Sequence, residues 1–240
     1  MGNNIKLWNV KDFTCLANIK NFNKNYWIFS ACFLNENNQI YIVTSNHNLD
    51  DYDIIEVFDM KGNKIKEINE SNDETFFIDT YYDNKSLIYY IIKGNKGYVK
   101  SYVFNKNTIY HKYNDNDNKD HHSIVINNNE IIIKLIESSV DGHIRIWNFH
   151  SGELLNKIKV GNYNYLNGIC LWSNEYLFVG CNDKTIKLIQ LKKGIIIKDL
   201  VGHSNRVSTV KKIIHTIYGE CILSQGKYND QIKLWIHKIN

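Results

Sequence analysis

The 240-residue chain contains no proline, only two arginines and no long hydrophobic run, and each absence narrows what it can be. Without proline, its turns must rely on glycine, asparagine and aspartate, which accept positive φ angles or bond their own backbone. Because no stretch of 18 apolar residues occurs, no membrane-spanning helix is indicated. The start of the chain lacks a basic region followed by an apolar stretch, so we expect no secretory signal.

Cysteine is also scarce, and no two cysteines form a Cys-x-x-Cys pair. An odd, scattered set of this kind indicates free thiols in a reducing compartment rather than a disulfide framework. We therefore expect a cytoplasmic protein, with a nuclear location as the alternative. The five positions are Cys15, Cys32, Cys170, Cys181 and Cys221.

The net charge is +4, but the positive charge is almost entirely lysine. Arg145 and Arg206 are the two arginines, and bidentate recognition of bases and phosphates depends mainly on arginine. Nucleic acid is therefore an unlikely partner from composition. The small basic clusters at 96–100, 192–193 and 211–212 are interpreted as solvated surface, with RNA or anionic lipid as the alternative ligand.

What the sequence does contain is a repeated hairpin, clearest at residues 140–158. The dipeptide Asp141-Gly142 strongly favours a tight turn. After it, Ile144 and Ile146 point to one side of a strand while Arg145 and Trp147 point to the other. A second turn and a second strand follow.

Copies of this hairpin recur every 42–50 residues along the chain. A period of roughly 40–45 residues with four strands per unit is the signature of a propeller blade. The same strand position carries an aromatic residue in five copies and an isoleucine in one. The six positions are Trp8, Phe58, Tyr102, Trp147, Ile189 and Trp235.

In these motifs the chain resembles the tryptophan-aspartate (WD) repeat family of β-propellers. The resemblance is specific at 141–148, 183–189 and 230–235, and Gly202-His203 matches the family's glycine-histidine pair. Around residues 70–130 only the spacing and the strand pattern support it. None of the six positions has the exact Trp-Asp pair; Trp8 and Trp147 are followed by asparagine, Phe58 is followed by aspartate, and Ile189 is aliphatic.

The resemblance implies an all-β fold, a β-propeller of four-stranded antiparallel blades in one domain. We expect about five blades, roughly at 25–69, 75–113, 121–160, 164–200 and 206–236, plus a partial blade at 5–19. This number does not make a standard ring. Either residues 14–19 complete the last blade or the chain is a piece of a larger propeller, and we favour an incomplete or irregular ring.

The resemblance also implies a buried network of His, Ser or Thr, Asp and Trp within a blade. In the last blade this set maps onto His203, Ser224, Asp230 and Trp235. In the third full blade it maps onto Ser139, Asp141 and Trp147, with His122 as a weaker fourth member, and in the fourth onto Asp183 alone. A Ser, His and Asp set also suggests a hydrolase. No Gly-x-Ser-x-Gly elbow is present, however, so we interpret the network as structural and expect no enzyme.

The best metal candidate is the run from His111 to His122, whose alternating aspartates resemble the start of a calcium loop. Lys119, Asp120 and Ile126 occupy positions where that loop needs a ligand, a glycine and a bidentate glutamate. We therefore expect an ordinary polar loop and no metal. No glycine-rich phosphate loop occurs, so no nucleotide or other cofactor is expected.

In propellers of the similar family, partners often touch the residues just before the turn aspartate and at the entry of the first strand. In this chain those positions are Val140, Asn182, Asn205, Arg206 and Tyr228. Arg206 is the sharpest candidate, because arginine is enriched in binding hot spots and is rare here. The sequence thus predicts a non-catalytic scaffold that binds proteins or peptides in a larger intracellular assembly.

Overall fold

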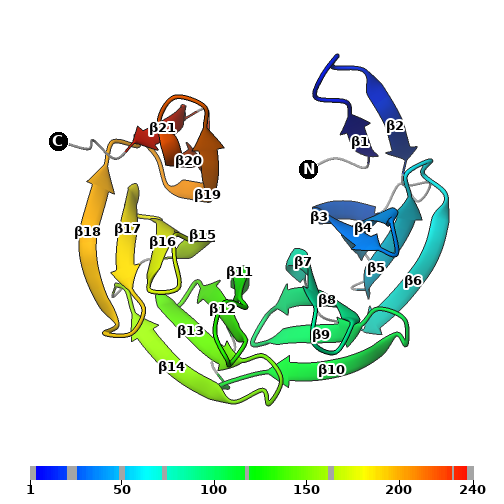
Figure 1. Cartoon of the computed structure of the whole chain (residues 1–240), viewed down its shortest axis with the longest axis horizontal. Helices are drawn as coiled ribbons and strands as arrows, with labels where there is room; N and C mark the ends of the chain where they lie inside the picture. The colour runs from blue at the N-terminus through cyan, green and yellow to red at the C-terminus, as the bar shows by residue number, and fades with distance from the viewer. Residues whose placement is uncertain are drawn as a thin grey trace. The chain divides into compact units, whose positions relative to one another are not determined.

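We describe a computed structural model of the chain at residues 4–20, 26–48, 52–71, 75–116, 119–161, 165–228 and 230–236. In these residues the elements are strands, and they pair into antiparallel sheets (Figure 1). None of the described residues forms a helix that is long and apolar enough to cross a membrane. The chain divides into two compact units, Met1–Asn114 (unit 1) and Asp115–Asn240 (unit 2).

The described residues of unit 1 form one two-stranded and two four-stranded sheets, each made of strands consecutive in sequence. We name the sheet β3–β6 blade A and the sheet β7–β10 blade B. The strands of unit 1 are β1 (Asn4–Trp8), β2 (Cys15–Lys20), β3 (Tyr26–Glu36), β4 (Gln39–Asn48), β5 (Tyr52–Asp59), β6 (Lys64–Ser71), β7 (Thr75–Asp83), β8 (Ile88–Asn95), β9 (Val99–Val103) and β10 (Thr108–Tyr113).

In unit 2, the residues that the structure describes form two four-stranded sheets and one three-stranded sheet, which we name blade C (β11–β14), blade D (β15–β18) and blade E (β19–β21). Its strands are β11 (His121–Asn127), β12 (Lys134–Ser139), β13 (His143–Asn148), β14 (Leu154–Lys159), β15 (Leu166–Leu171), β16 (Tyr176–Cys181), β17 (Thr185–Gln190), β18 (Ile195–Val201), β19 (Val207–His215), β20 (Gly219–Gly226) and β21 (Ile232–Ile236). The predicted fold class is confirmed, because the described chain is all-β and built of repeated antiparallel sheets. The single domain and its blade limits stay a prediction.

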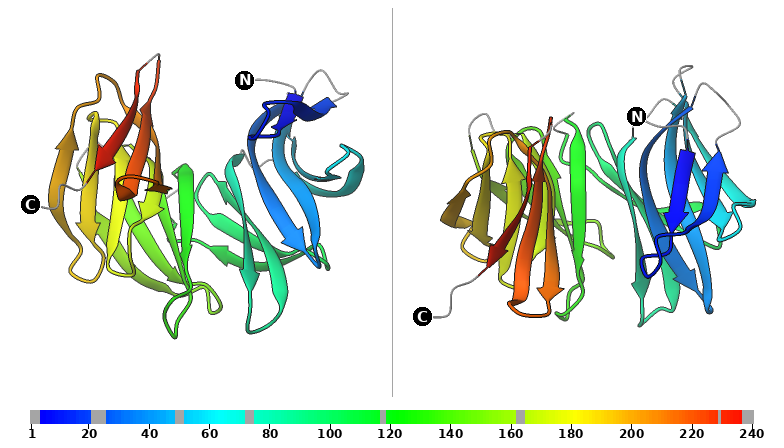
Figure 2. Two further views of the ribbon diagram at one scale, coloured as in Figure 1. Left: turned by 45° about the horizontal axis from the view of Figure 1, so that its top comes forward. Right: turned by 90° about the horizontal axis from the view of Figure 1, so that it is seen from above.

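The three sheets of unit 2 stand side by side, and both views in Figure 2 show the same succession. Their first strands, β11, β15 and β19, lie on one side, and the fourth strands β14 and β18 lie on the opposite, outer side (Figure 1). A hydrophobic cluster joins Ile144 and Ile146 of blade C to Leu177 and Val179 of blade D. Full burial of one such side chain contributes about 1.5–3 kcal/mol, so these contacts hold neighbouring blades together.

A second apolar cluster joins blade D to blade E. It includes Phe178 and Ile186 of blade D and Val207 and Ile222 of blade E, with Trp235 packed against it. The backbones approach closely here, because a Cβ on Gly168 would lie 2.8 Å from the Thr209 Cα. Glycine is therefore required at this blade contact.

The turn before the third strand follows the predicted chemistry. In blade C, Gly142 has a φ of 81°, and the His143 N–H donates to the Asp141 side chain at 3.0 Å. Blade D repeats the turn with Thr185 bonded to Asp183, but a lysine, Lys184, takes the positive φ, at 71°. A lysine in this region is strained, whereas a glycine is not.

In five hairpins, the strand that follows the strand of the repeated position carries a β-bulge opposite that position. Beside Trp147, for example, the register passes from Asn156 to Leu154, which leaves Leu155 as the extra residue. A bulge bends the strand and increases its twist. The extra residues in the five hairpins are Leu16, Ile65, Tyr110, Leu155 and Ile197.

Candidate functional site

The predicted network of blade E is assembled around His203, which precedes β19. Its Nε2 lies 2.6 Å from the Ser224 Oγ, and its Nδ1 lies 2.9 Å from the Asp230 Oδ2. The Trp235 indole N–H donates to the same Ser224 Oγ at 2.8 Å. Because the ionised carboxylate can only accept, Nδ1 carries the hydrogen, and in the neutral imidazole Nε2 then accepts from the Ser224 hydroxyl.

Asp230 also organises the chain that enters blade E. Its carboxylate accepts from the Ser204 hydroxyl at 2.8 Å and from the Asn205 backbone N–H at 3.1 Å. Burial by itself raises the pKa of Asp230, but the bonds from Ser204, His203 and two backbone N–H groups outweigh it and hold that pKa well below its usual range. Asp230 is therefore ionised at neutral pH and fastens the turn to the strand.

The arrangement of Ser224, His203 and Asp230 has the distances of a catalytic triad, but its surroundings do not suit catalysis. Ser224 is only 2% exposed, and its Oγ already contacts the Trp235 indole. A nucleophile must reach a substrate carbonyl. The geometry is that of a buried clamp.

Blade C satisfies its tryptophan differently. Trp147, which is 2% exposed, donates its indole N–H to the Glu137 Oε1 at 3.0 Å. The other carboxylate oxygen of Glu137 contacts the His121 Nδ1, and all three side chains are buried. Sequence reasoning missed Glu137 because it searched for serine or threonine.

The structure does not bring Ser139 or His122 into this network. The Ser139 hydroxyl is buried without a hydrogen-bond partner, and His122 lies 3.4 Å from the Asn167 Oδ1. The register explains the offset. Glu137 pairs with Arg145, two positions before Trp147, just as Ser224 pairs with Lys233, two positions before Trp235.

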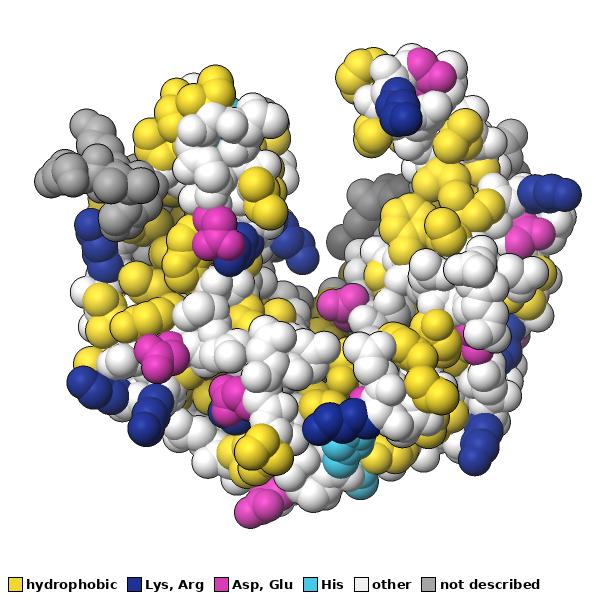
Figure 3. All heavy atoms as spheres, in the orientation of Figure 1, with side chains coloured by type: hydrophobic (Ala, Val, Ile, Leu, Met, Phe, Trp, Pro, Cys, Tyr) yellow, Lys and Arg dark blue, Asp and Glu magenta, His cyan; other side chains and the backbone are white. Residues whose placement is uncertain are grey.

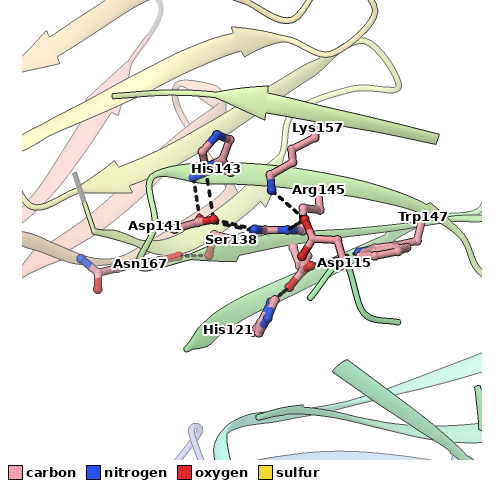
Figure 4. A network of polar contacts seen from close by, with 10 residues as sticks. Asp115, His121, Ser138, Asp141, His143, Arg145, Trp147, Lys157 and Asn167 are labelled. Carbon is pink, nitrogen blue, oxygen red and sulfur yellow. Dashed lines mark hydrogen bonds and ion pairs between the residues drawn. The ribbon is translucent and has the colours of Figure 1, made fainter. Parts of the chain in front are cut away.

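Asp141, expected beside Trp147, instead belongs to an ion network around Arg145 (Figure 4). The buried guanidinium donates to the Asp141 Oδ2 at 2.5 Å and to the Asp115 Oδ2 at 2.8 Å. Lys157 of β14 reaches the same Asp115 oxygen at 2.7 Å. Two carboxylates thus compensate the buried arginine, as a buried charge requires.

The pKa values follow from this arrangement. Burial favours the neutral form of Asp115, but Lys157 and Arg145 prevail and lower its pKa to about 2. The same opposition, dominated by Arg145, lowers the pKa of Asp141. The strand alternation that places Arg145 on the same face as Trp147 was the signal that could have identified Arg145 as buried.

Side chains of the run from His111 to His122, the candidate metal site, are engaged in contacts within the protein. Asp115 is engaged by two cationic side chains, and His121 turns into the blade toward Glu137. Residues 117 and 118 of the run lie outside the described residues. Among the residues that the structure does describe, no group of three His, Cys, Asp or Glu side chains could hold a metal ion.

In blade D, Asp183 bonds locally. It accepts from the Thr185 hydroxyl at 2.6 Å and lies 3.3 Å from the Lys187 Nζ, and these contacts lower its pKa against the effect of burial. Ile189 takes the aromatic position and is fully buried. Because Ile189 has no indole N–H that needs an acceptor, blade D does not require the network of His, Ser or Thr, Asp and Trp.

Three backbone hydrogen bonds repeat along one edge of unit 2, which we call the rim. In each blade, an N–H just after the second strand donates to a carbonyl at the entry of the first strand. The pairs are Val140 N to Asp120 O at 3.0 Å, Asn182 N to Tyr165 O at 3.1 Å, and Lys227 N to Arg206 O at 2.9 Å. The predicted partner positions Val140 and Asn182 therefore occupy equivalent places in blades C and D, whereas Arg206 stands at the carbonyl end of the same bond in blade E.

The rim of blade E presents Arg206 and Tyr228 together. The Arg206 Nη2 donates to the Tyr228 hydroxyl at 2.7 Å, and the guanidinium carbon lies 5.2 Å from the ring centroid. Tyr228 is 73% exposed and has a φ of 54°. The Asn205 Oδ1 accepts the Arg206 backbone N–H at 2.9 Å, which fixes the base of the pair.

A buried asparagine ties the three blades together beneath the rim. The Asn167 backbone carbonyl accepts from the Ser138 hydroxyl at 2.6 Å, and the Asn167 Nδ2 donates to the Val207 carbonyl at 2.9 Å. One residue of blade D thus contacts blades C and E. This link therefore helps to fix the rims of blades C, D and E relative to one another.

Comparison with known proteins gives one partial likeness. No family model matches the chain. A stretch of 75 residues, 31% of this chain, is 31% identical to the U3 small nucleolar RNA-associated protein 21 homolog of Schizosaccharomyces pombe. The match spans only 8% of that protein's length.

The repeat and the structure agree on the kind of protein. Four of the six hairpins that repeat in sequence belong to four-stranded antiparallel sheets of the described residues. The tryptophans of blades C and E donate to side chains of the second strand. The chain therefore resembles the WD-repeat β-propellers, both in its repeat motif and in the blades that the repeats form.

Proposed function

We propose that this chain is a non-catalytic scaffold that binds protein or peptide partners through the rim of unit 2. The Arg206–Tyr228 pair carries the proposal. An exposed tyrosine that is held by an arginine combines two side chains enriched in binding hot spots, and their mutual contact reduces the entropy lost on binding.

The other predicted rim residues support a shared surface. Val140 and Asn182 stand at the matching position of blades C and D, and the same backbone bond fixes each of them. A partner that contacts more than one blade would therefore meet a preorganised row of groups. The buried position of Ser224 favours a structural over a catalytic role for the blade E network.

The name of the similar protein supports a place in a larger assembly. That protein is named for association with a small nucleolar RNA, so we propose that this chain also acts within an RNA-associated complex. A nuclear location then fits better than the cytoplasmic one that the sequence favours. Imaging of the tagged chain in cells tests this part, and exclusion from the nucleus would contradict it.

The experiment that tests the rim is an affinity pull-down with the wild type and Arg206→Glu. We expect a discrete set of proteins with the wild type and its loss with the variant. Lys211→Glu is the matched control, because it reverses an exposed charge on β19, the same blade, away from the rim. Equal recovery with all three baits would refute the rim as the binding surface.

Direct RNA binding is the second candidate, and the name of the similar protein is the observation that favours it. The basic clusters differ in how freely their lysines can contact RNA. Lys212 pairs with Glu220 at 2.6 Å and lies over the Trp172 ring, whereas Lys192 and Lys193 are exposed. Binding of RNA that weakens steeply as salt rises would support this candidate. Anionic vesicles in the same assay distinguish a lipid.

A further inference from the structure

The outer strand of blade D differs from the other outer strands in its exposure. β6, β10 and β14 each bury one side chain among their described residues, namely Ile68, Tyr113 and Ile158. β18 buries none. Its first residues are three consecutive isoleucines, Ile195, Ile196 and Ile197, which are 46%, 42% and 48% exposed. The strand therefore presents an apolar strip.

The backbone edge of β18 is open as well. Within the described residues, β18 lies at the margin of blade D and pairs with β17 alone. An edge strand presents unpaired N–H and C=O groups to which another strand can be added, and proteins commonly protect such edges with lysines and bulges. β-Branched residues, which fill the start of β18, favour strand pairing.

The bulge at Ile197 is shared with every other outer strand, so it does not distinguish β18. After it the register is regular, from Lys198 opposite Leu188 to Val201 opposite Thr185. An added strand can pair along this part of the edge. The isoleucines before the bulge then supply apolar contact to its side chains.

The charges around the strip define the partner. Lys192, Lys193 and Lys198 are all exposed beside it, and the strand's one carboxylate, Asp199, is 2.9 Å from the Lys187 Nζ. In Figure 3, dark-blue lysine or arginine side chains and yellow hydrophobic side chains lie together on the side where Figure 1 draws β18. The excess positive charge favours an acidic partner and opposes pairing with a second copy of β18.

We propose that the edge of β18 binds an extended, acidic segment of a partner protein, which adds to blade D as a further antiparallel or parallel strand. Backbone hydrogen bonds would hold the segment, alternate β-branched side chains would contact the isoleucines, and its carboxylates would face the lysines. The surface lies on the outer side of blade D and is separate from Arg206, so this inference does not depend on the rim.

The test uses a short fluorescent peptide of alternating glutamate and valine, titrated with the full chain in an anisotropy assay. We expect saturable binding that is weakened at least about fivefold by Ile197→Glu, which removes an apolar contact and places a negative charge against the acidic peptide. The matched control is Leu155→Glu, which places the same charge at the bulge of β14, where Leu155 is 39% exposed. It should leave the affinity unchanged. Both sites are exposed, so thermal unfolding should confirm that both variants fold.

Two further peptides separate backbone pairing from simple charge attraction. The same peptide with methylated nitrogens at alternate positions should lose binding, because it cannot donate to the edge. The lysine–valine counterpart should also not bind, because the strip is basic. The proposal is overturned if the wild type shows no binding, if the methylated or basic peptide binds equally well, if Ile197→Glu has no effect, or if β18 instead forms a dimer of the chain.

Discussion

Blades C and E both have a turn aspartate before the third strand and a tryptophan on that strand, yet their tryptophans are held by groups of different character. In blade E the indole donates to the neutral Ser224, and in blade C it donates to the carboxylate of Glu137. The two acceptors occupy the same place in the register, two positions from the tryptophan pair. The fold therefore preserves the position of the acceptor rather than its chemistry.

The difference extends to the turn aspartate. In blade E, Asp230 bonds to His203, whereas in blade C the corresponding Asp141 accepts a hydrogen bond from Arg145. A carboxylate next to the indole can bind His121 by itself, so blade C no longer needs the turn aspartate for that role. A charged network and a mostly neutral one thus perform the same structural task.

The largest expected effect comes from breaking the charged network. Glu137→Ala should lower the free energy of unfolding by about 3–5 kcal/mol, because it leaves His121 and Trp147 buried without their common acceptor. Urea unfolding measures it. Glu137→Gln, which keeps an acceptor, should cost less. Equal losses for the two variants would contradict the role of the shared carboxylate.

Removing the neutral acceptor of blade E, the Ser224 hydroxyl, should lower the free energy of unfolding by less. Ser224→Ala removes one hydroxyl from His203 and Trp235 and should lower the free energy of unfolding by about 1–3 kcal/mol. Thr216→Ala, at an exposed turn, is the control and should have little effect. A loss larger than that of Glu137→Ala would reverse the comparison between the blades.

Acid should weaken the charged network of blade C, because Asp115 becomes protonated. Its pKa is lowered to about 2, so its contribution to stability is present above the unfolded-state value of about 3.9 and is lost as pH falls toward 2. Asp115→Asn should therefore make unfolding less dependent on pH in this window. The change should be about 1 kcal/mol or less, because solvent screens the group. Unfolding curves between pH 6 and 2 measure it, and an unchanged slope would argue against the Arg145 network.

The smallest effect compares the turns of blades C and D. Gly142 and Lys184 occupy the same left-handed position, with φ values of 81° and 71°. Lys184→Gly should raise the free energy of unfolding by about 0.5 kcal/mol, and Gly142→Lys should lower it by about 1 kcal/mol. Thermal unfolding of both variants checks the signs. Destabilisation by Lys184→Gly would show that the lysine makes a contact that outweighs the strain.

Local patterns were sufficient to predict the repeating unit. The Asp-Gly turn, the alternation from His143 to Asn148 and the recurrence of the aromatic position all act within a few residues of one another. They determine where strands begin, and the four-stranded sheets follow from their spacing. The bulge opposite the aromatic position was not predicted, because nothing in Leu155 or Ile197 distinguishes it from its neighbours.

The members of the site could be predicted only in part. Spacing was enough to place His203 and Ser224 together in blade E, where the chain follows the repeat of the similar family. It did not identify Glu137 or His121, because a search by residue type overlooks a different group at the same register position. The link from Arg145 to Asp115 spans 30 positions in the sequence, and no local pattern reports it.

The amino-acid sequence by itself determined the repeat, the turns and the strand alternation, because these depend on φ preferences and on side chains that alternate about a single strand. Only the tertiary structure decided which polar groups meet inside each blade, that Arg145 is buried between two carboxylates, and that β18 leaves three isoleucines exposed. These outcomes depend on strand register and on which faces neighbouring sheets cover. Both are properties of the packed sheets, and residues far apart in the chain set them.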